Sequence, residues 1–350
     1  MIDQPKEIRK DEQLNEAKLR TYLRGVFPWF TGPLNVLQFP NGFSNLTYAL
    51  QLGDRNCVLR RPPFGANIKS GHDMGREYRI LSALYPVFNK VPQVLHLCED
   101  SEVIGAPFYI MERVDGIVIR KSPPSTLSTQ EFFTKLSTST AICLAEIHSV
   151  DIETTGLSQL GKPVGYVRRQ IEGWTRRYAR AQTDEIGLMN EISTWLLRNM
   201  PVEVGFALIH NDYKYDNFIL DPRSHEIKVV LDWEMATIGC PLMDLGAALG
   251  YWLDPHDDQR LYSLPFCPTY LPGNLSRLEF AQCYAKHTGQ SLDDLVFYYV
   301  YGVWRIAVIV QQIYARYRAG FTLDSRFSSL GIGVQLLAQR AAQTIERGTV

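Results

Sequence analysis

Cysteine is scarce in this chain, and its six cysteines show none of the patterns of a redox or zinc site. None belongs to a C-x-x-C pair, and none clusters with histidines at zinc-ligand spacing. The N-terminal stretch "MIDQPKEIRKDEQ" is polar and lacks the apolar segment of a signal peptide. We therefore expect reduced, packed thiols and a cytoplasmic location.

The chain also lacks an excess of charge of either sign. Its 36 Lys and Arg and 37 Asp and Glu give a net charge of −1, so the whole molecule has no electrostatic preference for nucleic acid or anionic membranes. The longest apolar stretch, residues 295–318, carries Arg305 in its middle, which a membrane span would tolerate badly. We expect a buried core helix there and neither nucleic acid nor a membrane as partner, while a homodimer stays open.

Internal repeats and low-complexity tracts are absent, and 350 residues suit two lobes better than one compact core. The first third of the chain is rich in strand patterns, and the later part in helical ones. The expected elements are a helix at 11–26, a β-meander at 36–63, a helix at 75–86, a strand at 106–119 and helices at 129–148, 166–181, 187–199 and 276–288. We place an N-terminal lobe at 1–112, a hinge at 113–116 and a helical C-terminal lobe at 117–350.

The block 206–244 interrupts the helices and places many polar residues between apolar runs. Its segments "NFIL" and "IKVVLDW" read as strands joined by the turn "DPRSHE". In an antiparallel hairpin, Leu220 would face about Val229, and Asn217 would fall near Asp232. The polar loop with Asp212 opens at the same end, so two carboxylates and an amide oxygen converge. Such a set of oxygens suits Mg²⁺, which binds few protein groups and keeps phosphates as further ligands.

The order H-x-D-x-x-x-x-N, followed by Asp on the next strand, resembles the protein-kinase signature. More closely, "HNDYKYDNFIL" with "VVLDWEMATIGCPLMDLG" resembles the aminoglycoside phosphotransferase family of small-molecule kinases. Within it, the chain is similar to the kinase domains associated with acyl-CoA dehydrogenases, over roughly residues 30–320. The resemblance implies an α+β, bilobal protein-kinase-like fold. It also implies ATP- and Mg²⁺-dependent transfer of the γ-phosphate to a small-molecule hydroxyl.

The resemblance assigns the polar residues of the central block. Asp212 would be the catalytic base, and Lys214 a cation near the transferring phosphoryl group. Asn217 and Asp232 would hold Mg²⁺ on the ATP phosphates. His210 would brace the loop.

Further along the chain, the resemblance places Asp244 at the start of a helix. Its side chain would hydrogen-bond to the catalytic loop. Two departures from the family pattern follow Asp232. Trp233 and Glu234 replace Phe-Gly, as is usual among small-molecule kinases, and Cys240 stands where the family often has an acidic residue. We expect Cys240 to serve packing.

In the N-terminal lobe, "PNGFSNLTY" occupies the place of the phosphate-covering hairpin but is not G-x-G-x-x-G. Ser44 and Asn45 would contact phosphate. Arg60 stands where kinases carry a lysine and offers a fixed cation, with Glu77 as its partner on the following helix. Two alternatives remain. The stretch "PNGFSNLTY" could be an ordinary hairpin turn, and Arg60 and Glu77 could be surface charges.

The stretch "YIMERVDG" would connect the lobes, with backbone groups of Glu112 and Val114 pairing with adenine. Arg61 follows Arg60 on the same strand and should point to the opposite face.

The acceptor is the open question. Only eleven residues separate Asp232 from Asp244, which leaves no long activation segment to dock a protein substrate. Arg168, Arg176 and Arg305 favour an anionic acceptor such as a hydroxyacyl-CoA. Three further readings remain: Asp254 and its neighbours could bind a cationic aminoglycoside, the arginines could be solvated, or the chain could be a nucleotide-binding pseudokinase with a regulatory role.

Overall fold

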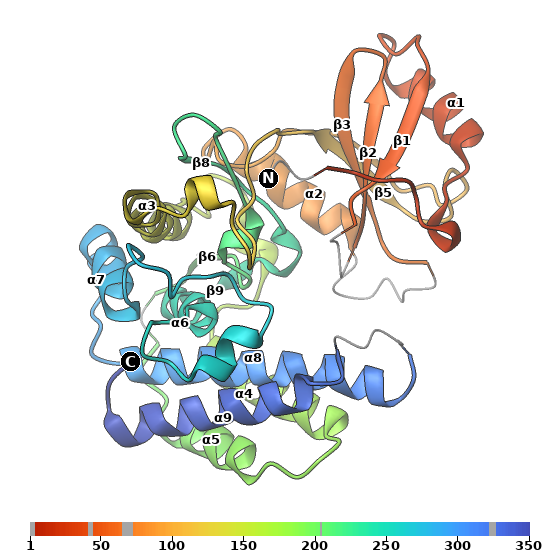
Figure 1. The fold of residues 1–350 in the computed structure, drawn as a ribbon. Coiled ribbons are helices and arrows are strands. Elements are labelled where there is room, and N and C mark those ends of the chain that lie inside the picture. The colour runs from red at the N-terminus through yellow and green to blue at the C-terminus, as the bar shows by residue number, and fades with distance from the viewer. Residues whose placement is uncertain (1–3, 41–44, 65–72, 204, 322–326) are drawn as a thin grey trace. The chain divides into compact units, whose positions relative to one another are not determined.

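The computed structural model describes residues 4–40, 45–64, 73–203, 205–321 and 327–350. The chain forms two compact units (Figure 1). Unit 1 consists of Met1–Val118 and Phe218–Met235, and unit 2 of Ile119–Asn217 and Ala236–Val350. The segment 218–235 thus belongs to unit 1, although it lies between the two stretches of unit 2 in the chain. The lobe boundaries at 112 and 116 stay a prediction.

Unit 1 is built on a five-stranded antiparallel sheet in the order β1-β2-β3-β5-β4. The first three strands form the predicted meander, and helices α1 and α2 accompany the sheet. Apolar residues of α1 and of β1, β2, β3 and β5 share one buried core. The elements are α1 (Glu16–Val26), β1 (Leu34–Gln38), β2 (Leu46–Leu52), β3 (Arg55–Arg61), α2 (Met74–Leu84), β4 (Val94–Cys98), β5 (Phe108–Glu112) and the 3₁₀ helices η1 (Lys10–Glu12) and η5 (Trp233–Met235).

The strand predicted at 106–119 is shorter than expected, because β5 ends at Glu112. The chain then passes close to the hairpin of the same unit, where Ile117 forms a bridge with Leu220. A Cβ at Gly116 would lie 2.3 Å from the carbonyl oxygen of Leu220, so only glycine permits this approach.

The predicted hairpin is present in unit 1 as β7 (Phe218–Leu220) and β8 (Ile227–Val230). Its register differs from the predicted one: Leu220 faces Ile227, two positions from Val229, and Val229 faces Ile219. Leu220 and Ile227 directly flank the turn 221–226, so counting outward from the turn gives this pair. A bulge between Ile219 and Leu220 then skips Lys228, whose side chain is exposed, and shifts the register by one position toward the predicted one.

Unit 2 is mainly helical, and its centre is α8 (Leu295–Arg318). This helix packs against α6, α9, α4 and α5, and Figure 1 shows it running beside α9. It is long and apolar enough to cross a membrane, but 78% of its apolar window is buried inside the protein, which fits the predicted core helix. A Cβ at Gly302 would lie 1.9 Å from the carbonyl oxygen of Gly246, so these two glycines let α8 and α6 touch.

The other predicted helices of unit 2 are present with nearly the predicted bounds. Strands β6 and β9 of this unit pair with each other. Helix α9 is absent from the sequence-based expectations. The elements are α3 (Gln130–His148), α4 (Tyr166–Ala181), α5 (Gly187–Arg198), β6 (Ala207–Ile209), β9 (Thr237–Gly239), α6 (Pro241–Tyr251), α7 (Arg277–Thr288), α9 (Leu330–Arg347) and the 3₁₀ helices η2 (Ser125–Leu127), η3 (Leu157–Leu160), η4 (Tyr215–Asn217) and η6 (Gln259–Ser263).

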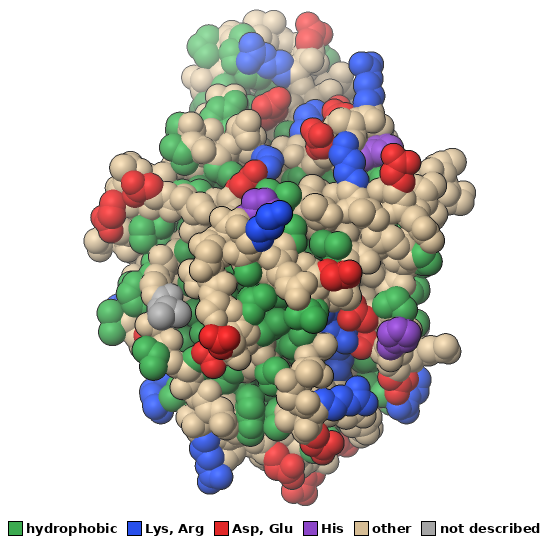
Figure 2. Space-filling model, turned by 90° about the vertical axis from the view of Figure 1, so that its left-hand side faces the viewer, with side chains coloured by type: hydrophobic (Ala, Val, Ile, Leu, Met, Phe, Trp, Pro, Cys, Tyr) green, Lys and Arg blue, Asp and Glu red, His purple; other side chains and the backbone are tan. Residues whose placement is uncertain are grey.

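Together, the antiparallel sheet of unit 1 and the helices of unit 2 confirm the predicted α+β fold class. All six cysteines have free thiols, and five of them are buried. On the face drawn in Figure 2, charged side chains of both signs are scattered among the others, in keeping with the balanced composition.

Candidate active site

A polar loop, residues 210–217, follows β6 in unit 2, and hydrogen bonds to Asp244 hold its backbone. This fully buried carboxylate, in the first turn of α6, accepts the backbone N–H groups of His210 and Asn211, each at 2.7 Å. Nε2 of His148 on α3 lies 3.1 Å from the same carboxylate, and its Nδ1 lies 2.8 Å from the hydroxyl of Tyr284. Burial raises the pKa of Asp244, but the partners His148 and His210 outweigh it and hold this pKa below its usual value. The predicted contact between Asp244 and the loop is present.

Asn211 has a left-handed backbone conformation just before Asp212. Its φ is 68°, in the left-handed region that a non-glycine residue seldom adopts. Nη2 of Arg305 on α8 donates to its carbonyl oxygen at 2.7 Å, and the hydroxyl of Tyr166 on α4 lies 3.4 Å from its side chain. Arg305, a candidate substrate residue, is therefore a buried group that positions the loop.

Asp212 is surrounded by groups that favour its ionised form. Oδ2 of Asp212 lies 3.0 Å from Nζ of Lys214 and accepts Nδ2 of Asn217 at 3.0 Å. His210 Nδ1 accepts the backbone N–H of Asp212 at 3.2 Å, so this histidine braces the loop. Burial raises the pKa of Asp212, yet Lys214 outweighs it and holds the pKa below its usual value. Asp212 is thus a carboxylate at neutral pH and able to accept a proton.

Lys214 is held between two carboxylates and an aromatic ring. Burial lowers its pKa, but the charges of Asp212 and then Asp216 outweigh burial and raise it well above its usual value. Its Nζ lies 5.0 Å from the ring centroid of Tyr251, the last residue of α6. Burial and the charge of Asp212 raise the pKa of Tyr251 to about 12. Tyr251 escaped the sequence-based search, because nothing in its local sequence ties it to Lys214, 37 residues earlier.

In unit 1, Arg60 on β3 gathers three carboxylates. Its Nη1 lies 3.0 Å from Oε1 of Glu77 on α2, and its Nη2 lies 2.9 Å from Oδ1 of Asp232 and 3.4 Å from Oε2 of Glu234. The same Glu234 oxygen accepts Nδ2 of Asn45 at 2.5 Å. Burial lowers the pKa of Arg60, but Glu77 and the other acids raise it well above the usual value. The pairing of Arg60 with Glu77 is present, and Glu234 is an addition that the sequence did not indicate.

Replacing Arg60 tests this cluster. Arg60→Met is expected to lower the free energy of unfolding by about 3–5 kcal/mol, because it leaves Glu77, which is 1% exposed, as a buried charge that has lost its guanidinium partner. The double variant Arg60→Met/Glu77→Gln should recover a large part of this loss. Urea unfolding of both variants at neutral pH measures the effect. A double variant no more stable than Arg60→Met would contradict the pairing.

Asp232 is fixed by its neighbour in the chain. The buried indole of Trp233 donates to the carbonyl oxygen of Val230 at 3.0 Å and contacts the ring of Phe88. Asp232 itself has a φ of 67°, and its side chain is 30% exposed. The carboxylate of Asp232 is thus a partly exposed oxygen group, which is the kind of ligand that Mg²⁺ accepts.

Asn217 also fits the role of a metal ligand. Its Nδ2 donates to both the carbonyl oxygen and Oδ2 of Asp212, which leaves the amide oxygen as the group that can face a cation. Asn217 belongs to unit 2 and Asp232 to unit 1. Within the described residues, no group of three or more His, Cys, Asp or Glu side chains is arranged to hold a metal ion. A magnesium site that uses one amide and one carboxylate does not need such a group.

The remaining predicted nucleotide contacts lie around β2 and β5. Ser44 lies outside the described residues, and Asn45 is engaged with Glu234. The backbone N–H of Glu112 donates to Gln93 at 2.8 Å, so an adenine contact at Glu112 would use its carbonyl oxygen. Arg61 follows the predicted alternation: it is buried on the other face, where its Nη1 donates to the carbonyl oxygen of Ile104.

The predicted acceptor residues are scattered in unit 2. Arg168 and Arg176 lie exposed on α4, and Arg168 comes no closer than 4.0 Å to Glu172. Asp254 is half-buried, and its Oδ2 lies 3.4 Å from Nε of Arg277. Among the residues that the structure describes, none of these three has a hydrogen bond or salt bridge to the loop 210–217.

Similar proteins are known for most of the chain. The model of the phosphotransferase enzyme family, abbreviated APH, matches residues 35–279, which is more than half of the chain. The chain belongs to the phosphotransferase enzyme family.

Among curated relatives of this family member, acyl-CoA dehydrogenase family member 10 of Mus musculus is 34% identical over 95% of the chain and 31% of its own length. Acyl-CoA dehydrogenase family member 11 of Homo sapiens is 30% identical over 96% of the chain and 43% of its own length. The chain thus spans less than half the length of these relatives. The predicted resemblance to the dehydrogenase-associated branch is confirmed.

Solved structures confirm the kinase-like fold of this phosphotransferase-family chain. A protein of Ralstonia eutropha, provisionally named an aminoglycoside phosphotransferase, is 29% identical with a TM-score of 0.79, over 96% of this chain and 99% of its own. Choline kinase of Cryptosporidium parvum is 12% identical with a TM-score of 0.64, over 95% and 96% of the two chains, and shows the fold alone.

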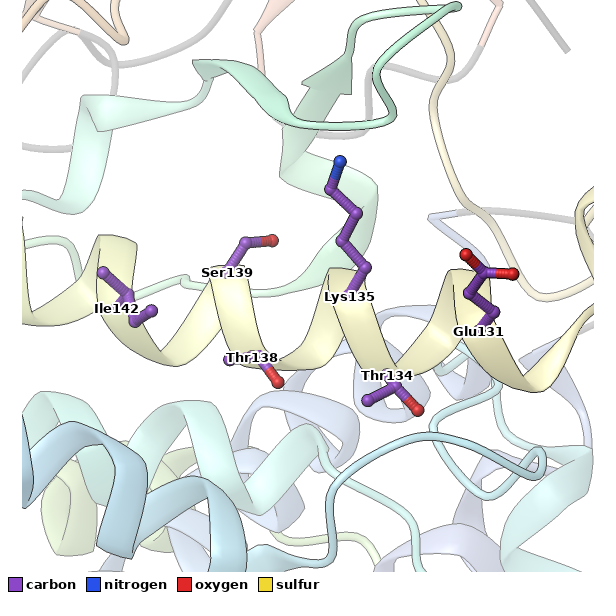
Figure 3. Close-up of a pocket in the computed structure, with 6 residues that line it drawn as sticks. All are labelled: Glu131, Thr134, Lys135, Thr138, Ser139 and Ile142. Carbon is purple, nitrogen blue, oxygen red and sulfur yellow. The ribbon is translucent and has the colours of Figure 1, made fainter.

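One pocket of the phosphotransferase-family fold plays no part in these contacts. It has a volume of about 520 Å³ and lies along α3, and all six of its lining residues come from that single helix (Figure 3). Lys135 and Ser139 point to one side of the helix, and Thr134 and Thr138 to another (Figure 3). No residue assigned from the sequence lines it.

Proposed function

We propose that this chain is an ATP- and Mg²⁺-dependent phosphotransferase that moves the γ-phosphate to a hydroxyl of an anionic small molecule. The observation that supports this best is the loop around Asp212. An ionised carboxylate is held between a lysine and an asparagine on backbone that Asp244 fixes. Phosphoryl transfer needs positioned charges more than covalent help, and this loop supplies them.

In the proposed reaction, Asp212 accepts the proton of the acceptor hydroxyl. Lys214 now neutralises Asp212, and its ammonium would turn to the transferring phosphoryl oxygens. Bound Mg²⁺ would neutralise the phosphate charge. We assign Asn217, through its amide oxygen, and Asp232 as its protein ligands.

For the nucleotide, we assign Arg60 as the cation that contacts the phosphates, with Glu77 holding it in place. Asn45, together with Ser44, would contact the phosphates from the segment just before β2. The carbonyl oxygen of Glu112 would accept the adenine amino group, and the backbone N–H of Val114 would donate to a ring nitrogen. The backbone N–H of Glu112 already donates to Gln93, so only its carbonyl oxygen is assigned to adenine.

The charge pairs of unit 2 support an anionic acceptor over a cationic aminoglycoside. The carboxylates that could attract a polycation already have arginine partners: Asp254 and Asp257 contact Arg277, and Asp258 contacts Arg260. A hydroxyacyl-CoA remains our example of an anionic acceptor, in line with relatives named as acyl-CoA dehydrogenase family members. A pseudokinase role is disfavoured, because such chains usually lose the base or a metal ligand.

A screen of acceptor classes tests the proposal. The chain is incubated with Mg–ATP and sets of anionic, neutral and cationic alcohols, including hydroxyacyl-CoA thioesters and aminoglycosides, and phosphorylated products are identified by mass spectrometry. We expect products from the anionic set. Efficient phosphorylation of aminoglycosides, with none of hydroxyacyl-CoA, would overturn the acceptor class.

Lys214→Met should change the pH dependence of the reaction. In the native chain Lys214 keeps the pKa of Asp212 low, whereas burial alone raises it. Without the lysine, Asp212 takes up its proton at a higher pH, and kcat/KM should fall on acidification where the unmodified chain still works. The measurement is kcat/KM from about pH 4.5 to 8, with exposed Lys162→Met as control. Parallel profiles for Lys214→Met and the unmodified chain would rule out this coupling.

A further inference from the structure

Two arginines from different helices of unit 2 meet at one aromatic ring. The guanidinium carbon of Arg177 on α4 lies 4.3 Å from the ring centroid of Trp174, and that of Arg305 on α8 lies 5.1 Å from the same centroid. The two carbons are therefore separated by at most the sum of these distances, 9.4 Å. Trp174 and Arg305 are buried, while Arg177 is exposed. The tryptophan thus connects a buried cation with one that solvent or a ligand can reach.

The charge of Arg177 is not balanced by a carboxylate. In the part of the chain that the structure describes, no salt bridge joins Arg177 to Asp or Glu, whereas Arg168, Arg260, Arg277 and Arg318 each have such a partner. Burial, together with the nearby charge of Arg305, lowers the pKa of Arg177. Like charges held this close are unfavourable in isolation, so a bound anion would stabilise the arrangement.

The same ring lies close to the proposed reaction centre. Nη2 of Arg305 donates to the carbonyl oxygen of Asn211, the residue directly before Asp212. Tyr301 lies one helical turn before Arg305 on α8, is buried, and interacts electrostatically with both arginines. Successive contacts therefore link the loop to Arg305, Arg305 to Trp174 and Trp174 to Arg177, across the packed helices α8 and α4.

We propose that Arg177, supported by Trp174, binds the anionic group of the acceptor whose hydroxyl meets Asp212. This inference rests on the proposed phosphotransferase function and names a specificity residue for it. The acceptor class is a small-molecule alcohol that carries a carboxylate or a phosphate. Arg305 is a positioning residue, because it holds the loop and the ring. Arg176, the neighbouring candidate from the sequence, has no such contact with an aromatic ring among the described residues.

Kinetics with matched acceptors test this assignment. Three probes share one hydroxyl group: 3-hydroxybutyrate carries a carboxylate, 3-hydroxybutyryl-CoA carries distant phosphates, and the 3-hydroxybutyryl N-acetylcysteamine thioester carries no charge. The acceptor with the highest kcat/KM, from these or from the class screen, is then used with Arg177→Ala, Arg177→Lys and Arg180→Ala. Arg180 is an exposed arginine on the same helix and serves as a control with the same loss of charge.

We expect the best acceptor to be anionic. Arg177→Ala should raise its KM roughly 10- to 100-fold with kcat little changed, because a charge-assisted hydrogen bond is lost from binding. Arg177→Lys should recover part of this loss, and Arg180→Ala should leave KM unchanged. The KM of an uncharged acceptor should not respond to Arg177→Ala. Whether the carboxylate or the CoA probe responds identifies the kind of anion.

Two results would overturn the inference while leaving phosphotransfer intact. One is a best acceptor that is neutral or cationic. The other is a KM for the anionic acceptor that changes equally in Arg177→Ala and Arg180→Ala, or that rises instead in Arg176→Ala. If no alcohol of any class is phosphorylated, the proposed function itself fails, and the inference fails with it.

Discussion

Replacing Asp212 by alanine is expected to lower kcat by about 10²–10⁴-fold, the range that general base catalysis contributes. The carboxylate is ionised because Lys214 holds its pKa low, and Asn217 fixes its orientation through Oδ2. The loop backbone should survive the change, since its N–H groups are held by Asp244. Mg–ATP affinity should therefore stay within a few-fold of the unmodified chain.

Steady-state kinetics and calorimetric titration of ATP measure the two effects of Asp212→Ala separately. Asp258→Ala is a suitable control, because Asp258 is an exposed carboxylate of the same unit whose salt-bridge partner is Arg260. A kcat for Asp212→Ala close to that of Asp258→Ala would show that Asp212 is not the base.

Asp232→Ala should have the second large effect, this time on nucleotide binding. Loss of a group that merely supports a metal ligand costs about 10- to 100-fold, so loss of a ligand itself should cost more. The fold should tolerate this change, because Arg60 keeps Glu77 and Glu234 as partners. We expect Mg²⁺-dependent ATP binding to be abolished in Asp232→Ala and retained in Asp212→Ala.

Titration of ATP with and without Mg²⁺ distinguishes these two roles. Asp232→Asn keeps an oxygen ligand but removes its charge, so its affinity should lie between those of the alanine variant and the unmodified chain. Equal losses of affinity in Asp232→Ala and Asp212→Ala would count against a division between base and metal ligand.

The sequence predicted best what local backbone geometry determines. The bounds of α4, 166–181, match the prediction, and the helix has apolar residues at regular spacing on one face. The pairing of Arg60 with Glu77 and the contact of Asp244 with the loop are also present, but these were predicted from the family resemblance and not from local geometry. The predicted hairpin register was wrong by two positions at Leu220, because the length of the turn 221–226 sets the first pair, and a bulge then shifts the strands by one position.

Other parts of the site depend on contacts between distant helices and could not be predicted from spacing. Tyr251 meets Lys214, and Arg177 meets Arg305 at Trp174, only because α4, α6 and α8 pack together. Arg305 illustrates the limit well. Its position inside an apolar helix indicated a functional or structural cation, but which carbonyl it contacts follows from the tertiary structure alone.

The most direct test of the central claim follows the γ-phosphate itself. The chain is incubated with Mg–ATP labelled on the γ-phosphate and a metabolite library, and the labelled product is identified by mass spectrometry, with Asp212→Ala in parallel. We predict label on the hydroxyl of a small anionic molecule, and none with the variant. If ATP binds with Mg²⁺ but neither an alcohol nor water ever receives the phosphate, and Asp212→Ala changes nothing, the chain is a nucleotide-binding pseudokinase and the account is wrong.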